Sequence, residues 1–167
     1  MLCFDTSDTR DFWSNACRQA NIDSQARHFA GTFSELTTVG DETVDDVIEI
    51  VDSLTQLAHD GQKRGTAHMQ LHFEHEGIRV REPGDYWIVT NSVGKPACIV
   101  QVTNVAVLPF DEVGEEFAAS EGEGDLTLEY WREAHKGYFM AQCAMWGETW
   151  RDDMPIVCES FELVYKQ

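Results

Sequence analysis

Apolar residues recur at helical spacing along two early stretches of the chain, residues 9–21 and 44–57. The first stretch predicts a short amphipathic helix. The second predicts a longer helix that begins behind Thr43, because Asp46 follows three positions later as in a capping box. Gly61 stands where the glycine that ends a helix is commonly found.

Later in the chain the apolar spacing changes. Alternation of apolar and polar residues, with glycine and proline at the turns, predicts strands at residues 69–74, 86–90, 97–107 and 156–165. Helical spacing predicts helices at 112–119 and 126–146, the second with Asp125 as its N-cap. Residues 23–40 have weak periodicity and predict a connection with one irregular helical turn near residues 25–29.

These elements predict a single α+β domain. Helices precede the strands, and a helical insertion separates the long third strand from the last one. That order fits a small mixed β-barrel better than a parallel sheet with alternating helices. A closed or nearly closed barrel would also hide the edges that short strands otherwise expose. The length of 167 residues suits one domain with little to spare.

The sequence predicts a cytoplasmic protein. Its first residues lack the basic and then apolar segments of a secretory signal, and no apolar run is long enough to span a bilayer. The five cysteines are scattered and form no Cys-x-x-Cys pair, so we expect reduced thiols rather than a zinc or redox site.

Acidic residues outnumber basic ones, 30 against 12, and give a formal net charge of −18. The acids are spread along the chain, which favours adaptation to high salt or high solubility over a dedicated basic partner. Such a molecule repels polyanions, so we expect no tight binding to duplex DNA. Residues 61–110 are the exception, so this segment is where charge permits an anionic or nucleotide-like ligand to bind, if the protein has one. Their basic residues are Lys63, Arg64, Arg79, Arg81 and Lys95.

The stretch from Gly61 to Thr66 has the pattern G-x-K-x-x-T. One interpretation is a cradle for phosphate or carboxylate, with Lys63 supplying charge and Thr66 a hydroxyl. A second is a catalytic pair, in which Lys63 loses its proton and activates Thr66 or a water. A third is a solvated lysine after a helix end. A Walker P-loop does not fit, because its lysine and threonine are adjacent and a helix follows them.

A second candidate is the acidic loop at residues 120–125, where Glu121, Glu123 and Asp125 surround two glycines. Its carboxylates could coordinate a divalent cation or hold a partner lysine. They could equally cap the helix that follows, because carboxylates are favoured at a helix N-terminus.

Three histidines, His68, His72 and His75, lie close together in the sequence. A zinc site would need a further convergent ligand, which the sequence does not place. We therefore expect these histidines to occupy exposed strand positions.

Together these motifs resemble the ASCH family, for which G-x-K-x-x-T is a hallmark. Downstream segments are similar to the longer bacterial members; they are Pro83-Gly84-Asp85-Tyr86, Pro96-Ala97-Cys98-Ile99, Pro109-Phe110-Asp111-Glu112-Val113, Phe117-Ala118, Glu121-Gly122-Glu123-Gly124-Asp125-Leu126-Thr127-Leu128, Tyr130-Trp131-Arg132 and His135. The resemblance covers residues 43–165. It implies an ASCH domain at 41–167, preceded by an N-terminal helical extension at 1–40.

The resemblance implies a PUA-like β-barrel, associated with RNA, that has a cleft beside the G-x-K-x-x-T stretch. Short members of the family hydrolyse the amide of N4-acetylcytidine with a lysine, a threonine and a glutamate, and a longer relative cleaves single-stranded RNA. Carried over by position, Lys63 is the base or activator and Thr66 the nucleophile, while Glu121 or Glu123 holds the lysine. The expected substrate contacts are Gly61, Arg64, Arg79, Arg81 and Lys95.

Three functions follow as hypotheses. The first is a hydrolase that cleaves the amide of an acylated cytidine-type nucleoside and needs no cofactor. The second is a ribonuclease that acts on single-stranded RNA with a divalent cation held by Glu121, Glu123 or Asp125. The third is a module that binds RNA or a modified base without catalysis. The high negative charge favours a small nucleoside over a polyanion.

Overall fold

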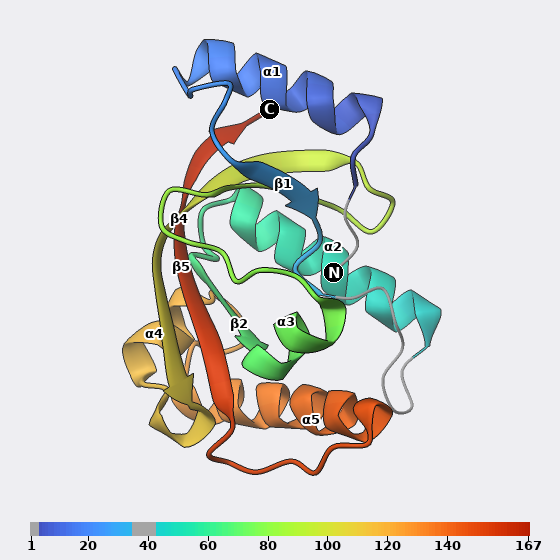
Figure 1. The fold of residues 1–167 in the computed structure, drawn as a ribbon, viewed down its shortest axis with the longest axis vertical. Coiled ribbons are helices and arrows are strands. Elements are labelled where there is room, and N and C mark those ends of the chain that lie inside the picture. Colours follow the sequence, from blue (N-terminus) through green and yellow to red (C-terminus); the bar gives the residue numbers. More distant parts are fainter. Residues whose placement is uncertain (1–3, 35–42) are drawn as a thin grey trace.

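A computed structural model describes residues 4–34 and 43–167 as a curved five-stranded sheet with packed helices (Figure 1). The helices are α1 (Ser7–Gln19), α2 (Val44–His59), α3 (Gln70–Glu76), α4 (Glu115–Ser120) and α5 (Leu128–Trp146), with a short 3-10 helix η1 (Phe110–Glu112). The strands are β1 (His28–Gly31), β2 (Gly65–Met69), β3 (Tyr86–Thr90), β4 (Pro96–Pro109) and β5 (Pro155–Lys166). Within the described residues, no helix has the length and apolar character needed to cross a membrane.

The sheet has the strand order β1-β3-β4-β5-β2, so β1 and β2 form its edges. Strand β1 is parallel to β3, and the other neighbours are antiparallel. The α+β class is as predicted, but the sheet is open rather than closed. Register shifts between β4 and β5, near Ile99 and near Val102, interrupt the regular pairing, and such bulges increase the bend and twist of a sheet. These two long strands run from α1 at one end of the molecule to α5 at the other (Figure 1).

Helix starts follow local hydrogen bonding. Thr43 and Asp46 form the predicted capping box of α2, each side chain accepting a bond from the other's backbone N–H. Helix α5 starts two residues later than predicted, because the hydroxyl of Thr127 rather than Asp125 caps it. Asp125 instead accepts hydrogen bonds from the N–H and the hydroxyl of Thr127, and this turn leads the chain into the helix.

Two sequence predictions were wrong. The alternation at residues 69–74 predicted a strand, yet β2 ends at Met69 and α3 follows directly. These residues fit the alternation of a strand and also the spacing of a helix, because Met69 and Phe73 are four positions apart and are both buried. Residues 23–40 were predicted to be a connection with one irregular helical turn near residues 25–29, but His28–Gly31 forms β1. A strand of four residues is too short to show a reliable alternation, and residues 35–40 lie outside the described part.

The part of the predicted extension that the structure describes is packed into the same unit as the rest. Phe12 and Trp13 of α1 share a buried cluster with Ile88 of β3 and Ile99 of β4. A second cluster joins α2 to the sheet through Trp87, Val100 and Phe161, and a third lies between α5 and β2. The N-terminal segment therefore contributes both a helix and an edge strand to this fold.

A buried ion pair joins the connection between α3 and β3 to strand β5. Arg81 Nε donates to Glu159 Oε2 at 2.6 Å, and both side chains are almost fully enclosed. The guanidinium also lies 4.5 Å from the ring centroid of Trp87 and 5.1 Å from that of Phe29. Glu159 on β5 is the register partner of Thr66 on β2. The sequence predicted Arg81 as a ligand contact, whereas its contacts here are with the protein's own core.

This pair generates a prediction about stability. Replacement of Glu159 by glutamine leaves the Arg81 guanidinium buried without its counter-charge, and breaking a buried pair from one side costs about 3–5 kcal/mol. We expect urea denaturation to show a loss of that size in the free energy of unfolding. Glu162→Gln, an exposed position on the same strand, is the control and should change it by less than about 0.5 kcal/mol.

The double variant Arg81→Met/Glu159→Met separates charge pairing from packing. Two apolar side chains of similar length leave no buried charge, so the double variant should be more stable than Glu159→Gln. Equal stability of Glu159→Gln and the Glu162→Gln control would contradict the structural role of the pair.

Candidate active site

The G-x-K-x-x-T stretch turns sharply between α2 and β2. Gly61 adopts a left-handed φ of +76°, and the N–H groups of Gln62 and Lys63 both donate to the carbonyl of Leu57. The next N–H, that of Arg64, donates to the Ser120 carbonyl at 2.7 Å. The turn therefore directs the Lys63 side chain inward and binds this stretch to the acidic loop that follows α4.

Close backbone contact also fixes the acidic loop. Gly122 has a φ of +74°, and a Cβ atom there would lie 2.7 Å from the carbonyl oxygen of Gln62. Only glycine accommodates both the conformation and the approach. The glutamates on either side of Gly122 are thereby held beside Lys63, although they lie about sixty positions away in the sequence.

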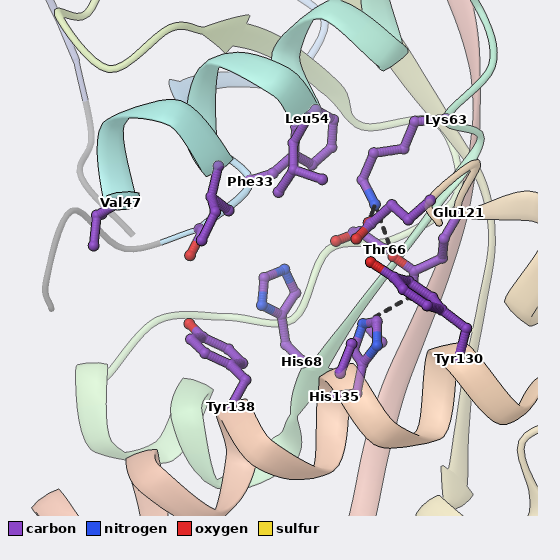
Figure 2. A pocket seen from close by; sticks show the side chains of 15 residues that line it. Phe33, Val47, Leu54, Lys63, Thr66, His68, Glu121, Tyr130, His135 and Tyr138 are labelled. Carbon is purple, nitrogen blue, oxygen red and sulfur yellow. Dashed lines mark hydrogen bonds and ion pairs between the residues drawn. The ribbon is translucent and has the colours of Figure 1, made fainter. Parts of the chain in front are cut away.

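Lys63 is held between these two glutamates. Its Nζ donates to Glu121 Oε2 at 2.7 Å and to Glu123 Oε1 at 2.5 Å (Figure 2). The side chains of Lys63 and Glu121 are each 1% exposed, whereas that of Glu123 is 24% exposed. Nζ also lies 5.3 Å from the ring centroid of Phe33. The ammonium is therefore almost fully buried. Both loop glutamates that the sequence offered as its partner lie within hydrogen-bonding distance of it.

Helix α5 fixes the remaining oxygen of Glu121. Trp131 Nε1 donates to Glu121 Oε1 at 2.8 Å, and His135 Nε2 lies 3.4 Å from the same atom. His135 Nδ1 lies 3.0 Å from the carbonyl oxygen of Trp131, one helical turn earlier. Trp131 and His135 also stack, with ring centroids 4.2 Å apart. Glu121 is thus satisfied on both oxygens, and its orientation is set by a rigid helix.

Attraction between these groups determines their charge. Burial lowers the pKa of Lys63, but Glu121 and then Glu123 raise it, and the pKa lies above the ordinary value of 10.5. Burial raises the pKa of Glu121, but Lys63 and then His135 lower it, and the pKa lies well below the ordinary value of 4.5. The site therefore contains an ammonium and a carboxylate at neutral pH.

These charges form one side of a cavity of about 290 Å³. Thr66, near the start of β2, lines this cavity, and so do His68, Tyr130 and Tyr138 (Figure 2). The facing wall comes from α2 and the segment after β1, and it is mostly apolar; its residues are Phe33, Ser34, Val47, Ile50 and Leu54. One side of the cavity can therefore bind a flat apolar surface while the other presents charge and hydroxyl groups.

The structure brings together only part of the predicted site. Lys63, Thr66, Glu121 and Glu123 line one cavity. The remaining predicted residues do not line it; they are Gly61, Arg64, Arg79, Arg81, Lys95 and Asp125.

The arginines and lysine expected to contact substrate have other surroundings. Arg79 bonds Asp85 Oδ2 at 2.7 Å and also pairs with Glu82. Lys95 is exposed on the turn between β3 and β4. Of the basic residues in 61–110, Arg79 is paired with acids of the same segment, and Lys63 is the one that lines the cavity.

Sequence reasoning missed several polar residues that line the cavity, among them His68, Tyr130, His135 and Tyr138. It also placed His68 and His72 at exposed strand positions, whereas both are buried and His72 lies on α3. Strand geometry offered a signal for His68, because it lies two residues after Thr66 and so on the same face. Among the described residues, no group of three histidine, cysteine or acidic side chains is arranged to hold a metal ion.

The charge state of Glu121 generates a prediction about acid stability. Its folded-state pKa lies below the ordinary 4.5, so the carboxylate stabilises the protein above that pH, and this contribution is lost as the pH falls through the folded-state value. We expect Glu121→Gln to lower the free energy of unfolding by about 3–5 kcal/mol at neutral pH. Below pH 4.5 the difference from the wild type should narrow steadily in denaturation experiments.

Glu129→Gln is the matched control, because it makes the same charge change at an exposed position of α5. It should shift stability little at any pH. A difference between Glu121→Gln and the wild type that stays constant into acid would contradict the ionised state of Glu121.

Comparisons with known proteins agree with this architecture. A family model described as the ASCH domain matches residues 42–165. No curated protein matches the chain. A crystal structure of an ASCH domain from Lactobacillus crispatus is 30% identical in sequence, covers 98% of this chain and 99% of its own, and superposes with a TM-score of 0.76.

A second solved structure, protein EF3133 from Enterococcus faecalis, is 26% identical, covers 96% of this chain and 94% of its own, and has a TM-score of 0.77. Both similarities extend over nearly the whole chain and so include the segment before residue 42. The family model, the shared fold and the position of the G-x-K-x-x-T stretch at the cavity lead to one conclusion. The chain belongs to the ASCH family, whose PUA-like domain is associated with RNA.

Proposed function

We propose that this ASCH protein is a hydrolase that cleaves the amide of an N4-acylated cytidine-type nucleoside. The observation that supports this most directly is the buried Lys63 ammonium between Glu121 and Glu123, beside Thr66 in a cavity. Buried charges reduce stability unless they are well paired, and clusters of them with shifted pKa values are typical of active sites. The cavity of about 290 Å³ is in the range that suits a small molecule.

Amide hydrolysis needs a nucleophile, a proton acceptor, a group that stabilises the oxyanion and a proton donor for the leaving amine. Thr66 supplies the hydroxyl that attacks the acyl carbon. Glu123, the more exposed carboxylate, takes the hydroxyl proton. Lys63 stabilises the negative charge that develops on the acyl oxygen, and Glu121 positions Lys63.

The bond from carbon to N4 then breaks, and the amine leaves with the proton that Glu123 accepted. Water hydrolyses the resulting Thr66 ester in a second, analogous step and releases the carboxylic acid. In this scheme Lys63 begins as an ammonium, because its pKa is raised. The sequence-based hypothesis of a lysine that first loses its proton therefore requires a transfer to a carboxylate before it can act as a base.

Charge favours a nucleoside over RNA as the substrate. The net charge of −18 repels a polyanion, and phosphate contacts dominate the affinity of proteins for nucleic acids. Arg79 and Arg81, which were expected to make such contacts, are bonded to Asp85 and Glu159. A neutral nucleoside avoids both obstacles.

The metal-dependent ribonuclease has less support from the geometry. Glu121 and Glu123 both bind Lys63, so a divalent cation would have to compete with a buried ammonium for their oxygens. Asp125 is exposed and accepts hydrogen bonds from Thr127. The proposed reaction uses protein side chains alone and requires no cofactor.

One experiment distinguishes the three functions. Purified protein is incubated with N4-acetylcytidine and, separately, with labelled single-stranded RNA, each with and without a chelator. The proposal predicts release of cytidine and acetate that the chelator does not affect, with intact RNA. RNA cleavage that the chelator abolishes would favour the ribonuclease, and binding without turnover of either substrate would favour a binding module.

A second prediction concerns the nucleophile. Thr66→Ser keeps the hydroxyl and should retain substantial activity, whereas Thr66→Val keeps the shape and should lose at least about a hundredfold in kcat/KM. Thr103→Val, the same change at an exposed position of β4, is the control and should leave the rate unchanged. Equal activity of Thr66→Val and wild type would show that water attacks directly or that another group is the nucleophile.

A further inference from the structure

His68 occupies a position in the cavity that the proposed reaction does not use. It follows Thr66 by two residues on β2, so both side chains project from the same face of the sheet. Its ring points into the cavity between Lys63 and Tyr138 (Figure 2). The residue is only 8% exposed.

One nitrogen of this ring, Nε2, has no hydrogen-bond partner among the described residues. The same nitrogen is buried. Leaving a buried polar group unsatisfied costs about 1–3 kcal/mol. A leucine or phenylalanine would fill the same space without that cost. The histidine at this position is therefore explained better by a ligand that bonds it than by packing.

The surroundings of His68 keep its ring uncharged. Burial is the main reason that its pKa lies well below the ordinary value of 6.5, and the Arg81 guanidinium and then His72 add to the effect, while Glu121 opposes it. A neutral imidazole donates from one nitrogen and accepts at the other. It does not attract phosphate or carboxylate as a cation would, so it suits an uncharged polar group.

The spacing of Thr66 and His68 along β2 limits which ligand could carry the uncharged polar group that bonds His68. Residues two apart on a strand are separated by about 7 Å. That is of the order of a six-membered ring with an amide on one side. A planar base on the apolar wall near Phe33 and Leu54, with its amide at Thr66, would place its opposite edge near His68.

We propose that His68 is a specificity-determining residue, which donates a hydrogen bond to the polar edge of a neutral planar base on the side opposite the amide at Thr66. This proposal rests on the function proposed above. The carbonyl oxygen on C2 of a cytosine is an acceptor of the required kind, and it lies farther from the amide than the ring nitrogen N3 does. A base without such an edge would leave Nε2 unsatisfied and would bind less well, and this difference selects the substrate.

Two variants of His68 test the hydrogen bond. His68→Phe keeps a flat ring and removes both nitrogens, and His68→Gln keeps a polar group of similar reach. Calorimetric titration with cytidine and initial rates with N4-acetylcytidine give Kd, KM and kcat for each. We expect His68→Phe to weaken cytidine binding and raise KM by about tenfold or more, with a smaller change in kcat, and His68→Gln to restore most of the loss.

Thermal unfolding without ligand shows whether His68 serves binding or merely stabilises the fold. Because His68→Phe removes an unsatisfied buried nitrogen, it should be at least as stable as the wild type. His75→Phe, an exposed histidine of α3 that does not line the cavity, is the control and should change neither binding nor KM.

Each outcome decides a separate question. Unchanged Kd and KM in His68→Phe, or a lower melting temperature of that variant with no loss of binding, would overturn the role of His68. If the wild type binds cytidine but does not hydrolyse N4-acetylcytidine, the proposed function fails, and weaker cytidine binding by His68→Phe still supports the recognition role. If the wild type does not bind cytidine at all, the recognition role fails as well.

Discussion

The buried ammonium of Lys63 is the interaction on which the rest of the site depends. Removing a charge from water costs several kcal/mol even after the protein relaxes, and a single partner seldom offsets it. Here two carboxylates meet the same Nζ, and Glu121 is itself bonded on its other oxygen by Trp131. Each of these hydrogen bonds offsets part of the cost of burying the charge beside it. We therefore expect the loop after α4 and the first half of α5 to be held in place.

Backbone contacts hold the two halves of the cluster together. The Arg64 N–H bonds the Ser120 carbonyl, and the Arg64 carbonyl accepts from the Phe161 N–H of β5. Gly122 allows the loop to lie against Gln62, where any side chain would collide. Thr66 follows at once on β2, opposite Glu159 and its partner Arg81. The hydroxyl is thus placed by an edge strand that is paired along its length with β5, and such fixed placement is what the proposed reaction requires.

The two ion pairs have different surroundings and therefore different consequences. Arg81 lies against aromatic rings, and neither Arg81 nor Glu159 lines the cavity described above, so we expect their effect to be on stability. Lys63 and Glu123 line the cavity, and the partly exposed Glu123 side chain can be reached by a ligand there. His68 adds an uncharged group to the same wall. The cavity therefore presents charged groups at Lys63 and Glu123 and a neutral polar group at His68, although the net charge of the whole molecule is −18.

The sequence alone determined the elements whose signals are local. The capping box at Thr43, the strand at residues 86–90 and the G-x-K-x-x-T motif with its acidic loop depend on neighbours a few positions apart, and these could be predicted, as could the pairing of Lys63 with a loop glutamate. Tertiary structure decided what depends on distant partners. Strand β1 exists because β3 offers it a parallel edge, Arg81 is buried because Glu159 on β5 pairs with it, and His68 faces the cavity because α5 and α2 enclose that face. Charge pairing and burial are properties of the folded surroundings, which a pattern along the chain does not contain.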